Sequence, residues 1–266
     1  MHDAPLDRSI RVTLALLFVG QATIAGAVLV RYGVTLRETV WYLIAAPLVH
    51  LVIVLVVTAL RELFVNADTG QRLSRVNLAN VLSLVRLSSA PTVLWLVLLA
   101  RTYPVGPVVV PITAGVFLTD LLDGQISRRA HQVTRIGRYL DSSSDYMVLF
   151  VVSVALLTYG LVSTWLFVIV MLRLGIHLAG QIVLLIVLRW RIPFRTSWLG
   201  KASVFAIMAL FALSLLRLVD SIPTWFVTVH AVAEYVTAAI ACLSLAEKTY
   251  EFITDITLAR RERAGR

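Results

Sequence analysis

The sequence contains little charge and almost no cysteine. Only 15% of its 266 residues are charged, and Cys242 is its single cysteine. One cysteine excludes an internal disulfide and any metal site built on several thiolates. A charged fraction this low, beside 59% hydrophobic residues, excludes an ordinary soluble domain and a disordered chain. The composition therefore favours an α-helical membrane protein.

Eight apolar runs follow one another along the chain. Each is long enough, or nearly so, to cross about 30 Å of hydrocarbon as an α-helix. We therefore predict an all-α fold, a polytopic membrane helix bundle with about eight transmembrane helices. The first run continues past Ala25-Gly26-Ala27, so we expect a retained helix rather than a cleaved signal peptide. The runs are Val12–Val30, Val40–Leu60, Asn80–Ala100, Val105–Leu122, Tyr146–Leu161, Trp165–Leu188, Ser203–Leu218 and Trp225–Leu245.

The basic residues lie between the apolar runs, and mostly on one side. The chain has 24 Lys and Arg against 15 Asp and Glu, a net charge of +9. With the N-terminus in the cytoplasm, 19 basic residues fall on the cytoplasmic side, 4 fall outside, and Arg173 lies within a run. The positive-inside rule then predicts N-in, C-in topology. We expect an integral protein of a bacterial-type cytoplasmic membrane, whose basic residues meet anionic lipid and not nucleic acid.

Four of the nine aspartates fall between residues 120 and 145. Asp120 and Asp123 lie at the cytoplasmic end of the fourth span at spacing i,i+3, and Asp141 and Asp145 lie at the start of the fifth at i,i+4, so each pair shares a helix face. Four neighbouring carboxylates repel one another and are costly at a membrane boundary unless cations neutralise them. Oxygen ligands suit Mg²⁺ or Mn²⁺, and two ions suit phosphoryl transfer. Helix capping explains one such aspartate, but it does not require two facing pairs.

The residues around these aspartates form a spaced motif. It resembles the signature D-x2-D-G-x2-A-R-x8-G-x3-D-x3-D of the CDP-alcohol phosphatidyltransferase family, which includes phosphatidylglycerophosphate synthase-type enzymes of the membrane. Every spacing agrees, and the one departure is a serine where the family usually has alanine. The motif in this chain is Asp120-x2-Asp123-Gly124-x2-Ser127-Arg128, then eight residues, then Gly137-x3-Asp141-x3-Asp145.

A second pattern opens the third apolar run. The first core helix of the family often opens with the pattern Asn-x2-Thr/Ser-x2-Arg-x4-Pro. This chain resembles it at Asn80, Ser83, Arg86 and Pro91. Family members have six core helices, and the chain offers six runs from Asn80 onward. The resemblance therefore implies three parts. Residues 1–76 form an N-terminal extension with two transmembrane helices, residues 77–248 form the six-helix catalytic core, and residues 249–266 form a basic cytoplasmic tail.

The resemblance also implies roles for the matching residues. All four aspartates of the motif are expected to bind metal, as two Mg²⁺ or Mn²⁺ ions, and Asp145 is also the expected general base. The donor nucleotide and its phosphates are expected to contact Gly124, Ser127, Arg128 and Gly137, because glycine admits close approach and a guanidinium holds phosphate oxygens.

Basic residues of the sixth and seventh runs are candidates for binding an anionic acceptor. The alternative for Arg173 is an ion pair with Glu234 that holds two helices together, since intramembrane charges face a partner or a cavity. The alternative for the others is ordinary positive-inside charge. The acceptor candidates are Lys201, Arg191, Arg195 and Arg173.

The implied reaction transfers a substituted phosphate group from a CDP-alcohol, with CDP-diacylglycerol first, to an acceptor alcohol, and releases CMP. Glycerol 3-phosphate is the first candidate acceptor, although Gly200-Lys201 does not continue into the Lys-Thr-x2-Gln pattern of relatives that use it. The alternatives are a CDP-choline or CDP-ethanolamine phosphotransferase acting on diacylglycerol, a membrane prenyltransferase, and an ion-coupled transporter. The expected partners are the CDP-alcohol, a lipid substrate and the bilayer, with the active site at the cytoplasmic face. The oligomeric state stays open, and a homodimer is one option.

Overall fold

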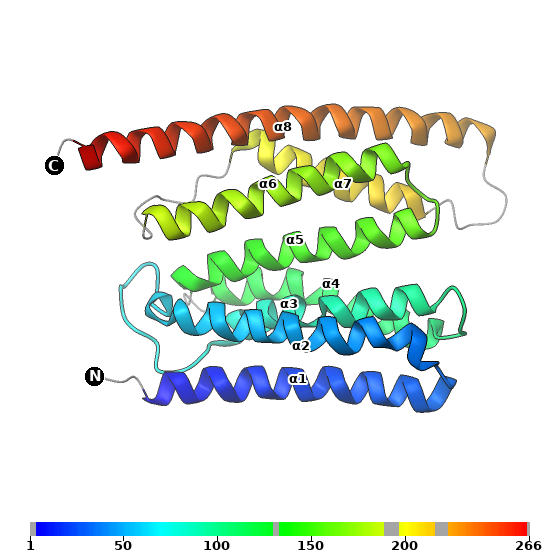
Figure 1. Cartoon of the computed structure of the whole chain (residues 1–266), viewed down its shortest axis with the longest axis horizontal. Helices are drawn as coiled ribbons and strands as arrows, with labels where there is room; N and C mark the ends of the chain where they lie inside the picture. The colour runs from blue at the N-terminus through cyan, green and yellow to red at the C-terminus, as the bar shows by residue number, and fades with distance from the viewer. Residues whose placement is uncertain (1–3, 130–132, 189–196, 216–222, 265–266) are drawn as a thin grey trace. The chain divides into compact units, whose positions relative to one another are not determined.

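The computed structural model describes residues 4–129, 133–188, 197–215 and 223–264, which form eight α-helices (Figure 1). The side chains of residues 120–129 and 181–188, among others, are not described. A short 3-10 helix, η1 (Arg61–Leu63), follows the second helix. The α-helices are α1 (Ala4–Tyr32), α2 (Leu36–Ala59), α3 (Leu78–Leu99), α4 (Gly106–Arg129), α5 (Arg135–Thr158), α6 (Thr164–Leu188), α7 (Trp198–Leu215) and α8 (Thr224–Ala264).

Five helices of the described residues are long and apolar enough to cross a membrane, namely α1, α2, α3, α5 and α8. Shorter apolar stretches lie in α4, α6 and α7, at residues 106–116, 164–180 and 198–214. Each predicted apolar run thus coincides with one helix. Many large apolar side chains of α1, α2 and α8 are exposed, as is expected of surfaces that face lipid. The prediction of a polytopic helical membrane protein is confirmed.

Several helices extend beyond the apolar runs that predicted them. The first begins at Ala4 instead of Val12, α5 begins at Arg135 instead of Tyr146, and α8 continues through Ala264. Hydropathy marks the part of a helix that lies in hydrocarbon, whereas the helix itself continues through polar residues in the head-group region. As a result, both aspartates of the second motif half lie within a helix, and the described part of the predicted basic tail, residues 249–264, continues α8.

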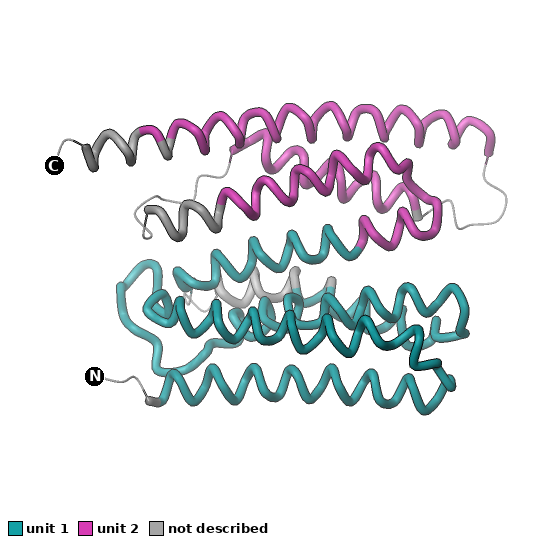
Figure 2. Tube along the Cα trace, in the orientation of Figure 1, with its two compact units in different colours: residues 1–151 teal, residues 152–266 magenta. Residues whose placement is uncertain are grey.

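The chain forms two compact units, residues 1–151 and residues 152–266, and α5 crosses their boundary (Figure 2). The division follows contacts between helices, and it is a different division from the one predicted at residues 76/77, which followed the family motif. The boundaries of the predicted extension and core stay a prediction.

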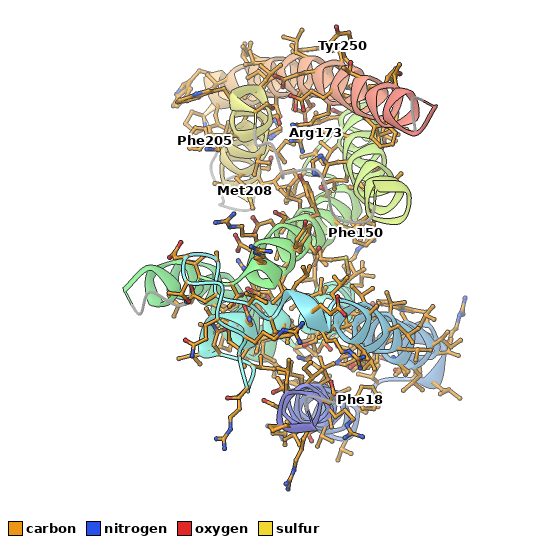
Figure 3. All side chains as sticks on the ribbon, turned by 90° about the vertical axis from the view of Figure 1, so that its left-hand side faces the viewer. Phe18, Phe150, Arg173, Phe205, Met208 and Tyr250 are labelled. Atoms are coloured by element: carbon orange, nitrogen blue, oxygen red, sulfur yellow. The ribbon has the colours of Figure 1, made fainter. Side chains whose placement is uncertain are left out.

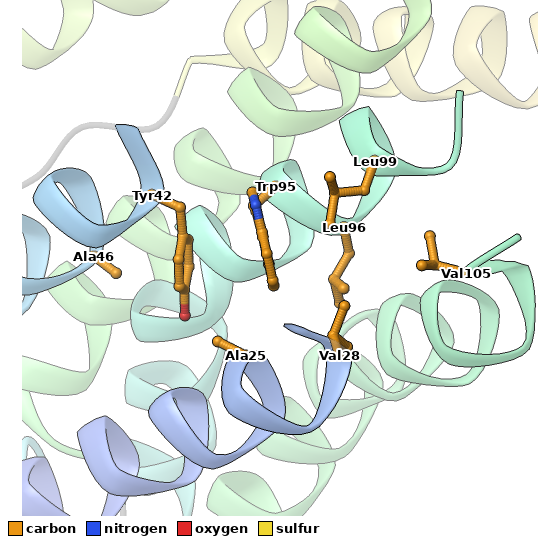
Figure 4. Close-up of a cluster of buried hydrophobic side chains, with 8 residues drawn as sticks. All are labelled: Ala25, Val28, Tyr42, Ala46, Trp95, Leu96, Leu99 and Val105. Atoms are coloured by element: carbon orange, nitrogen blue, oxygen red, sulfur yellow. The ribbon is translucent and has the colours of Figure 1, made fainter. Parts of the chain in front are cut away.

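Helix α3 is the central helix of the first unit. It contacts α1, α2 and α4, and 61% of its apolar window is buried, against 22% for α1 and 28% for α2. A cluster of eight buried side chains from α1, α2, α3 and the α3–α4 connection includes Trp95, which is fully buried (Figure 4). The first two helices therefore cover one face of the third. The cluster consists of Ala25, Val28, Tyr42, Ala46, Trp95, Leu96, Leu99 and Val105.

Hydrogen bonds and an aromatic stack join α2 to α3. The rings of Tyr42 and Trp95 stack with a centroid separation of 4.6 Å, and the Tyr42 hydroxyl lies 3.1 Å from the hydroxyl of Thr92. The Trp95 indole N–H donates to the carbonyl oxygen of Glu38 over 3.2 Å. Within a bilayer, tight packing and interhelical hydrogen bonds hold helices together because lipid is as apolar as the side chains. These contacts therefore attach α2 to α3 specifically.

The connection between α2 and α3 contains a hairpin, residues 64–73. Val65 pairs with Arg72 in an antiparallel bridge, and the amide of Leu73 donates to the carbonyl of Phe64 over 2.9 Å. The hairpin lies at the same end of the unit as the start of α1, because the amide of Val76 donates to the Ser9 hydroxyl over 3.1 Å.

In the second unit, α8 packs against both α6 and α7. The Ser203 hydroxyl of α7 donates to the Ser244 hydroxyl of α8 over 3.2 Å. Ser214 of α7 lies 2.8 Å from the Nε2 atom of His230 on α8. Both pairs are buried, so small polar side chains form the interface between these helices.

Candidate active site

Asp141 and Asp145 lie one turn apart on α5, and a single arginine of α3 contacts both. Arg86 donates from Nη2 to Oδ1 of Asp141 over 2.9 Å and from Nη1 to Oδ1 of Asp145 over 3.4 Å. The Arg86 side chain is 1% exposed, whereas the two carboxylate side chains are 53% and 43% exposed. A buried cation therefore orients two carboxylates that remain open to water and to ligands.

The start of α5 is attached to α3 by a second group of polar contacts. The Thr134 hydroxyl caps the helix by accepting from the amide of Gly137 over 2.9 Å. The same hydroxyl donates to Oδ1 of Asn80 over 2.9 Å. Thr134 and Asn80 are both buried. The asparagine and the arginine of the pattern that opens α3 thus both act on α5.

Gly137 lies where no side chain fits. A Cβ atom there would lie 2.7 Å from Oγ1 of Thr134 and 2.8 Å from Oδ1 of Asn80, distances that atoms in contact do not reach without displacement. The structure gives this glycine a packing reason, which is the close approach of α3 to the start of α5. Its predicted contact with the nucleotide donor stays a prediction.

The other half of the motif lies at the end of α4. The backbone of residues 120–129 is helical, so Asp120 and Asp123 share a helix face as the spacing predicted. Their side chains lie outside the described part of the structure, as do those of Gly124, Ser127 and Arg128. That the two aspartate pairs face each other stays a prediction. Among side chains that are described, no three His, Cys, Asp or Glu residues form a group that could hold a metal ion.

The described aspartates fit a divalent cation in their chemistry. Asp141 and Asp145 supply hard oxygen donors on one helix face, and their side chains are about half exposed, so an ion can reach them. Mg²⁺ is bound in proteins through one or two carboxylates together with substrate phosphates and water. The pair therefore suits a magnesium or manganese ion that also binds a pyrophosphate.

Arg86 is the functional residue to which sequence reasoning gave no role. It entered only as part of the pattern that opens α3. One signal pointed to a role, because an arginine within an apolar span faces a partner or a cavity. Its partners are separated from it by 55 and 59 residues in the chain, and no local spacing predicts contacts of that range.

The predicted acceptor residues belong to the second unit. Arg173 is 5% exposed and lies inside this unit (Figure 3), where its Nη2 atom donates to the carbonyl of Gly200 over 3.2 Å. Lys201 is exposed near the start of α7. Arg191 and Arg195 lie outside the described residues. The structure thus brings Arg173 to Gly200 in the first turn of α7, and the binding role of these residues stays a prediction.

The contacts that the structure gives for Glu234 are with residues other than Arg173, its predicted alternative partner. The carboxylate of Glu234 accepts from the amide of Ser163 over 3.0 Å and also from the Ser163 hydroxyl. The Nδ1 atom of His230, on the same helix, lies 3.9 Å from this carboxylate. Glu234 thus holds the start of α6 to α8, and Arg173 contacts the start of α7 instead.

Comparison with known proteins gives one family and a small group of relatives. The family model of the CDP-alcohol phosphatidyltransferases matches residues 76–246. A protein from Streptomyces coelicolor named cardiolipin synthase (CMP-forming) is 32% identical over 158 residues, which cover 56% of this chain and 70% of that protein. Proteins from Mycobacterium bovis and Mycobacterium tuberculosis, provisionally assigned as cardiolipin synthases, are 33% identical over 146 residues, covering 55% of this chain and 66% of theirs.

The family match includes the whole aspartate motif, both described carboxylates and the arginine that orients them. It begins just before α3 and ends within α8. Because it extends over more than half of the chain, the protein belongs to the CDP-alcohol phosphatidyltransferase family and is an enzyme of phospholipid synthesis that transfers a substituted phosphate group from a CDP-alcohol and releases CMP.

Proposed function

We propose that the protein transfers the phosphatidyl group of CDP-diacylglycerol to phosphatidylglycerol, forming cardiolipin and CMP. The Streptomyces coelicolor relative is named cardiolipin synthase (CMP-forming), and the mycobacterial relatives are provisionally assigned the same activity. Cardiolipin has two phosphatidyl groups on one glycerol, so a synthesis that releases CMP joins a CDP-linked phosphatidyl group to phosphatidylglycerol. Glycerol 3-phosphate, the acceptor first expected from the sequence, is the competing candidate.

The observation that carries this proposal is the pair of carboxylates held by Arg86. Asp141 and Asp145 are fixed by a buried guanidinium at 2.9 and 3.4 Å, yet both are open to ligands. We propose that they bind Mg²⁺ or Mn²⁺ together with Asp120 and Asp123 of α4. When bound, the metal supplies positive charge that stabilises the donor pyrophosphate and the departing CMP.

The protein's own residues then perform the transfer. A hydroxyl is a weak nucleophile near neutral pH, so its proton must be removed as it attacks. We assign this proton to the carboxylate of Asp145. The acceptor oxygen forms a bond to the β-phosphorus, the bond from that phosphorus to the bridging oxygen breaks, and CMP leaves with the bridging oxygen. Arg128, Gly124, Ser127 and Gly137 are the proposed contacts of the donor.

We propose that the anionic acceptor is held by basic residues of the second unit. A guanidinium or ammonium binds a phosphate oxygen through charge-assisted hydrogen bonds. Arg173 is buried beside the exposed Lys201, which is an arrangement that suits a lipid phosphate at the membrane boundary. Arg191 and Arg195 complete the proposed set.

We place the site at the cytoplasmic face of a bacterial-type membrane. The positive-inside rule puts the N-terminus in the cytoplasm. Within the first unit, Ser9 of α1 contacts Val76 before α3, and Arg86 of α3 contacts the aspartates, so these groups lie toward one end of the unit. The bilayer then supplies both lipid substrates while the nucleotide stays in water. A homodimer is the proposed assembly, which light scattering of the purified protein tests.

Product identification tests the proposed reaction. Two reactions would contain purified protein, Mg²⁺ and radiolabelled CDP-diacylglycerol with either phosphatidylglycerol or glycerol 3-phosphate. A third reaction would contain radiolabelled CDP-choline and diacylglycerol. We expect labelled cardiolipin in the first reaction and background in the others. Phosphatidylglycerophosphate as the product would replace the acceptor and keep the donor. Labelled lipid from none of the acceptors, in protein that is folded, would contradict the proposal.

A further inference from the structure

The hairpin between α2 and α3 is hydrogen-bonded to the segment that leads into α5 (Figure 1). The amide of Ala67 donates to the carbonyl of Val133 over 2.8 Å, and the amide of Arg135 donates to the carbonyl of Val65 over 3.0 Å. Between these two bonds, Asn66 and Thr134 form an antiparallel bridge. The segment before α5 is therefore paired with the outer edge of the hairpin.

The hairpin has a defined internal structure. The side-chain oxygen of Asn66 accepts from the amides of Asp68 and Thr69 over 2.9 and 3.0 Å, and the amide of Gly70 donates to the carbonyl of Asn66 over 3.0 Å. Gly70 has a φ of +71°, a conformation that glycine adopts without strain. The turn thus holds Asn66 in place for its bridge to Thr134.

The paired segment is also the segment that α3 holds. Thr134, at the centre of the bridge, donates to Asn80 and caps α5 at Gly137. The start of α5 is therefore held to the hairpin through the backbone amide of Arg135 and to α3 through the side chain of Thr134, the residue before the helix. About two helical turns further along α5 lie Asp141 and Asp145, the carboxylates that Arg86 of α3 contacts.

We propose that the hairpin of residues 64–73 is a positioning element of the active site, which fixes where α5 begins and thereby where Asp141 and Asp145 stand. This inference rests on the proposed metal-binding function of the two aspartates. It gives the first 76 residues a part in the chemistry, because the hairpin is attached to α1 and α2 and lies outside the catalytic core expected from the sequence. Small displacements of a catalytic group lower reaction rates strongly.

The backbone of Arg135 offers a direct test. Arg135 is the first residue of α5, where proline is favoured because its φ suits the helix and the first amides have no partner within the helix. Its side chain is exposed. Arg135→Pro therefore removes the amide that donates to Val65 and leaves the helix able to form. Arg135→Ala removes the same side chain, keeps the amide, and is the matched control.

A second pair of variants perturbs the hairpin far from α5. Gly70→Val places a β-branched residue at a positive φ, which strains the turn. Gly70→Asn places there a residue that tolerates this conformation. No heavy atom lies within 4 Å of a Cβ at this position, so the two variants differ in backbone strain and not in packing. If Arg135→Pro does not fold, the comparison of Gly70→Val with Gly70→Asn still tests the positioning role of the hairpin.

The measurement is the affinity of the purified full-length variants in nanodiscs for Mn²⁺, from the electron paramagnetic resonance signal of the free ion. We expect Arg135→Pro and Gly70→Val to raise the apparent Kd about fivefold, which is the weight of one net backbone hydrogen bond. Both controls should stay within about twofold. A merely structural role lowers the melting temperature and leaves the Kd at 20 °C unchanged.

Two outcomes overturn different statements. If Asp141→Asn loses Mn²⁺ binding but Arg135→Pro and Gly70→Val bind Mn²⁺ like their controls, the positioning role of the hairpin is refuted and the metal site stands. If Asp141→Asn binds Mn²⁺ like the unchanged protein, the proposed metal site is refuted, and the inference that rests on it is refuted as well.

Discussion

Replacing Arg86 by methionine tests whether this residue orients the catalytic carboxylates. Methionine has a similar length and no charge, so it fills much of the same buried space while it removes both contacts to α5. Arg86 is 1% exposed and its partners are 53% and 43% exposed. Asp141 and Asp145 can therefore be hydrated when the guanidinium is lost, and we expect the variant to fold and to insert.

The expected loss of turnover follows from the freedom that the two carboxylates gain. An unrestrained side chain has three staggered positions about χ1. If one position of each aspartate supports the reaction, two freed side chains lower the productive fraction about ninefold, or about 1.3 kcal/mol. We therefore expect Arg86→Met to lower turnover about tenfold. Arg86→Lys keeps the charge but offers one compact donor in place of a fork, and we expect a loss of about threefold.

The assay is CMP release by purified protein from CDP-diacylglycerol at saturating phosphatidylglycerol. Ser89→Ala is the matched control, because Ser89 is buried on the same helix and donates to the carbonyl of Arg86 over 3.0 Å without contact to the aspartates. We expect that control to stay within about twofold. Wild-type turnover of folded Arg86→Met would refute the reasoning. Faster turnover with tighter Mn²⁺ binding would show that the guanidinium competes with the metal.

Four further changes test the packing. Gly137→Ala should lower the free energy of unfolding by about 1–3 kcal/mol. The control Gly115→Ala, whose Cβ meets no atom within 4 Å, should not destabilise the protein. Thermal melts test both variants, and equal melting temperatures would contradict the close approach at Gly137. Trp95→Ala should lower the free energy of unfolding by about 3–5 kcal/mol. A chain beginning at Arg72 lacks the α1 and α2 side of the same cluster, so it should aggregate at a lower temperature than the full chain, as size-exclusion chromatography after heating would show. Glu234→Gln should destabilise by about 1–3 kcal/mol, since one acceptor for Ser163 becomes a donor, while CMP release at 20 °C stays near the wild-type rate; a large loss of activity in stable protein would give Glu234 a role in the reaction.

The helices of this protein could be predicted from the sequence because continuous apolar runs have one stable solution in a bilayer. The ends of the helices could not be predicted as well. The apolar run that predicted α5 begins only at Tyr146, although the i,i+4 spacing already placed Asp141 and Asp145 on a helix, since hydropathy reports contact with lipid and not helical structure. The same limit explains why α8 extends to Ala264.

The candidate site was predicted as far as local spacing allowed. The aspartate motif gave the residues of α4 and α5, because i,i+3 and i,i+4 neighbours share a helix face. The contacts of Arg86 and the pairing of Asn66 with Thr134 join residues far apart in the chain. Such contacts depend on which helices pack together, and no periodicity in a single sequence reports that. The role of the first 76 residues was hidden for the same reason.

Single-turnover release of CMP, measured with and without divalent metal in wild-type protein and in Asp145→Asn, tests the central claim most directly. Asparagine keeps the shape of the side chain and one oxygen, and it removes the basic carboxylate. We expect wild-type protein to release CMP from CDP-diacylglycerol with Mg²⁺ and not in excess chelator. Asp145→Asn should bind the donor and lose about 10²–10⁴-fold in rate, the usual contribution of a general base. Full wild-type activity in chelator, or normal turnover of Asp145→Asn, would contradict a metal-dependent transfer in which this carboxylate removes the proton.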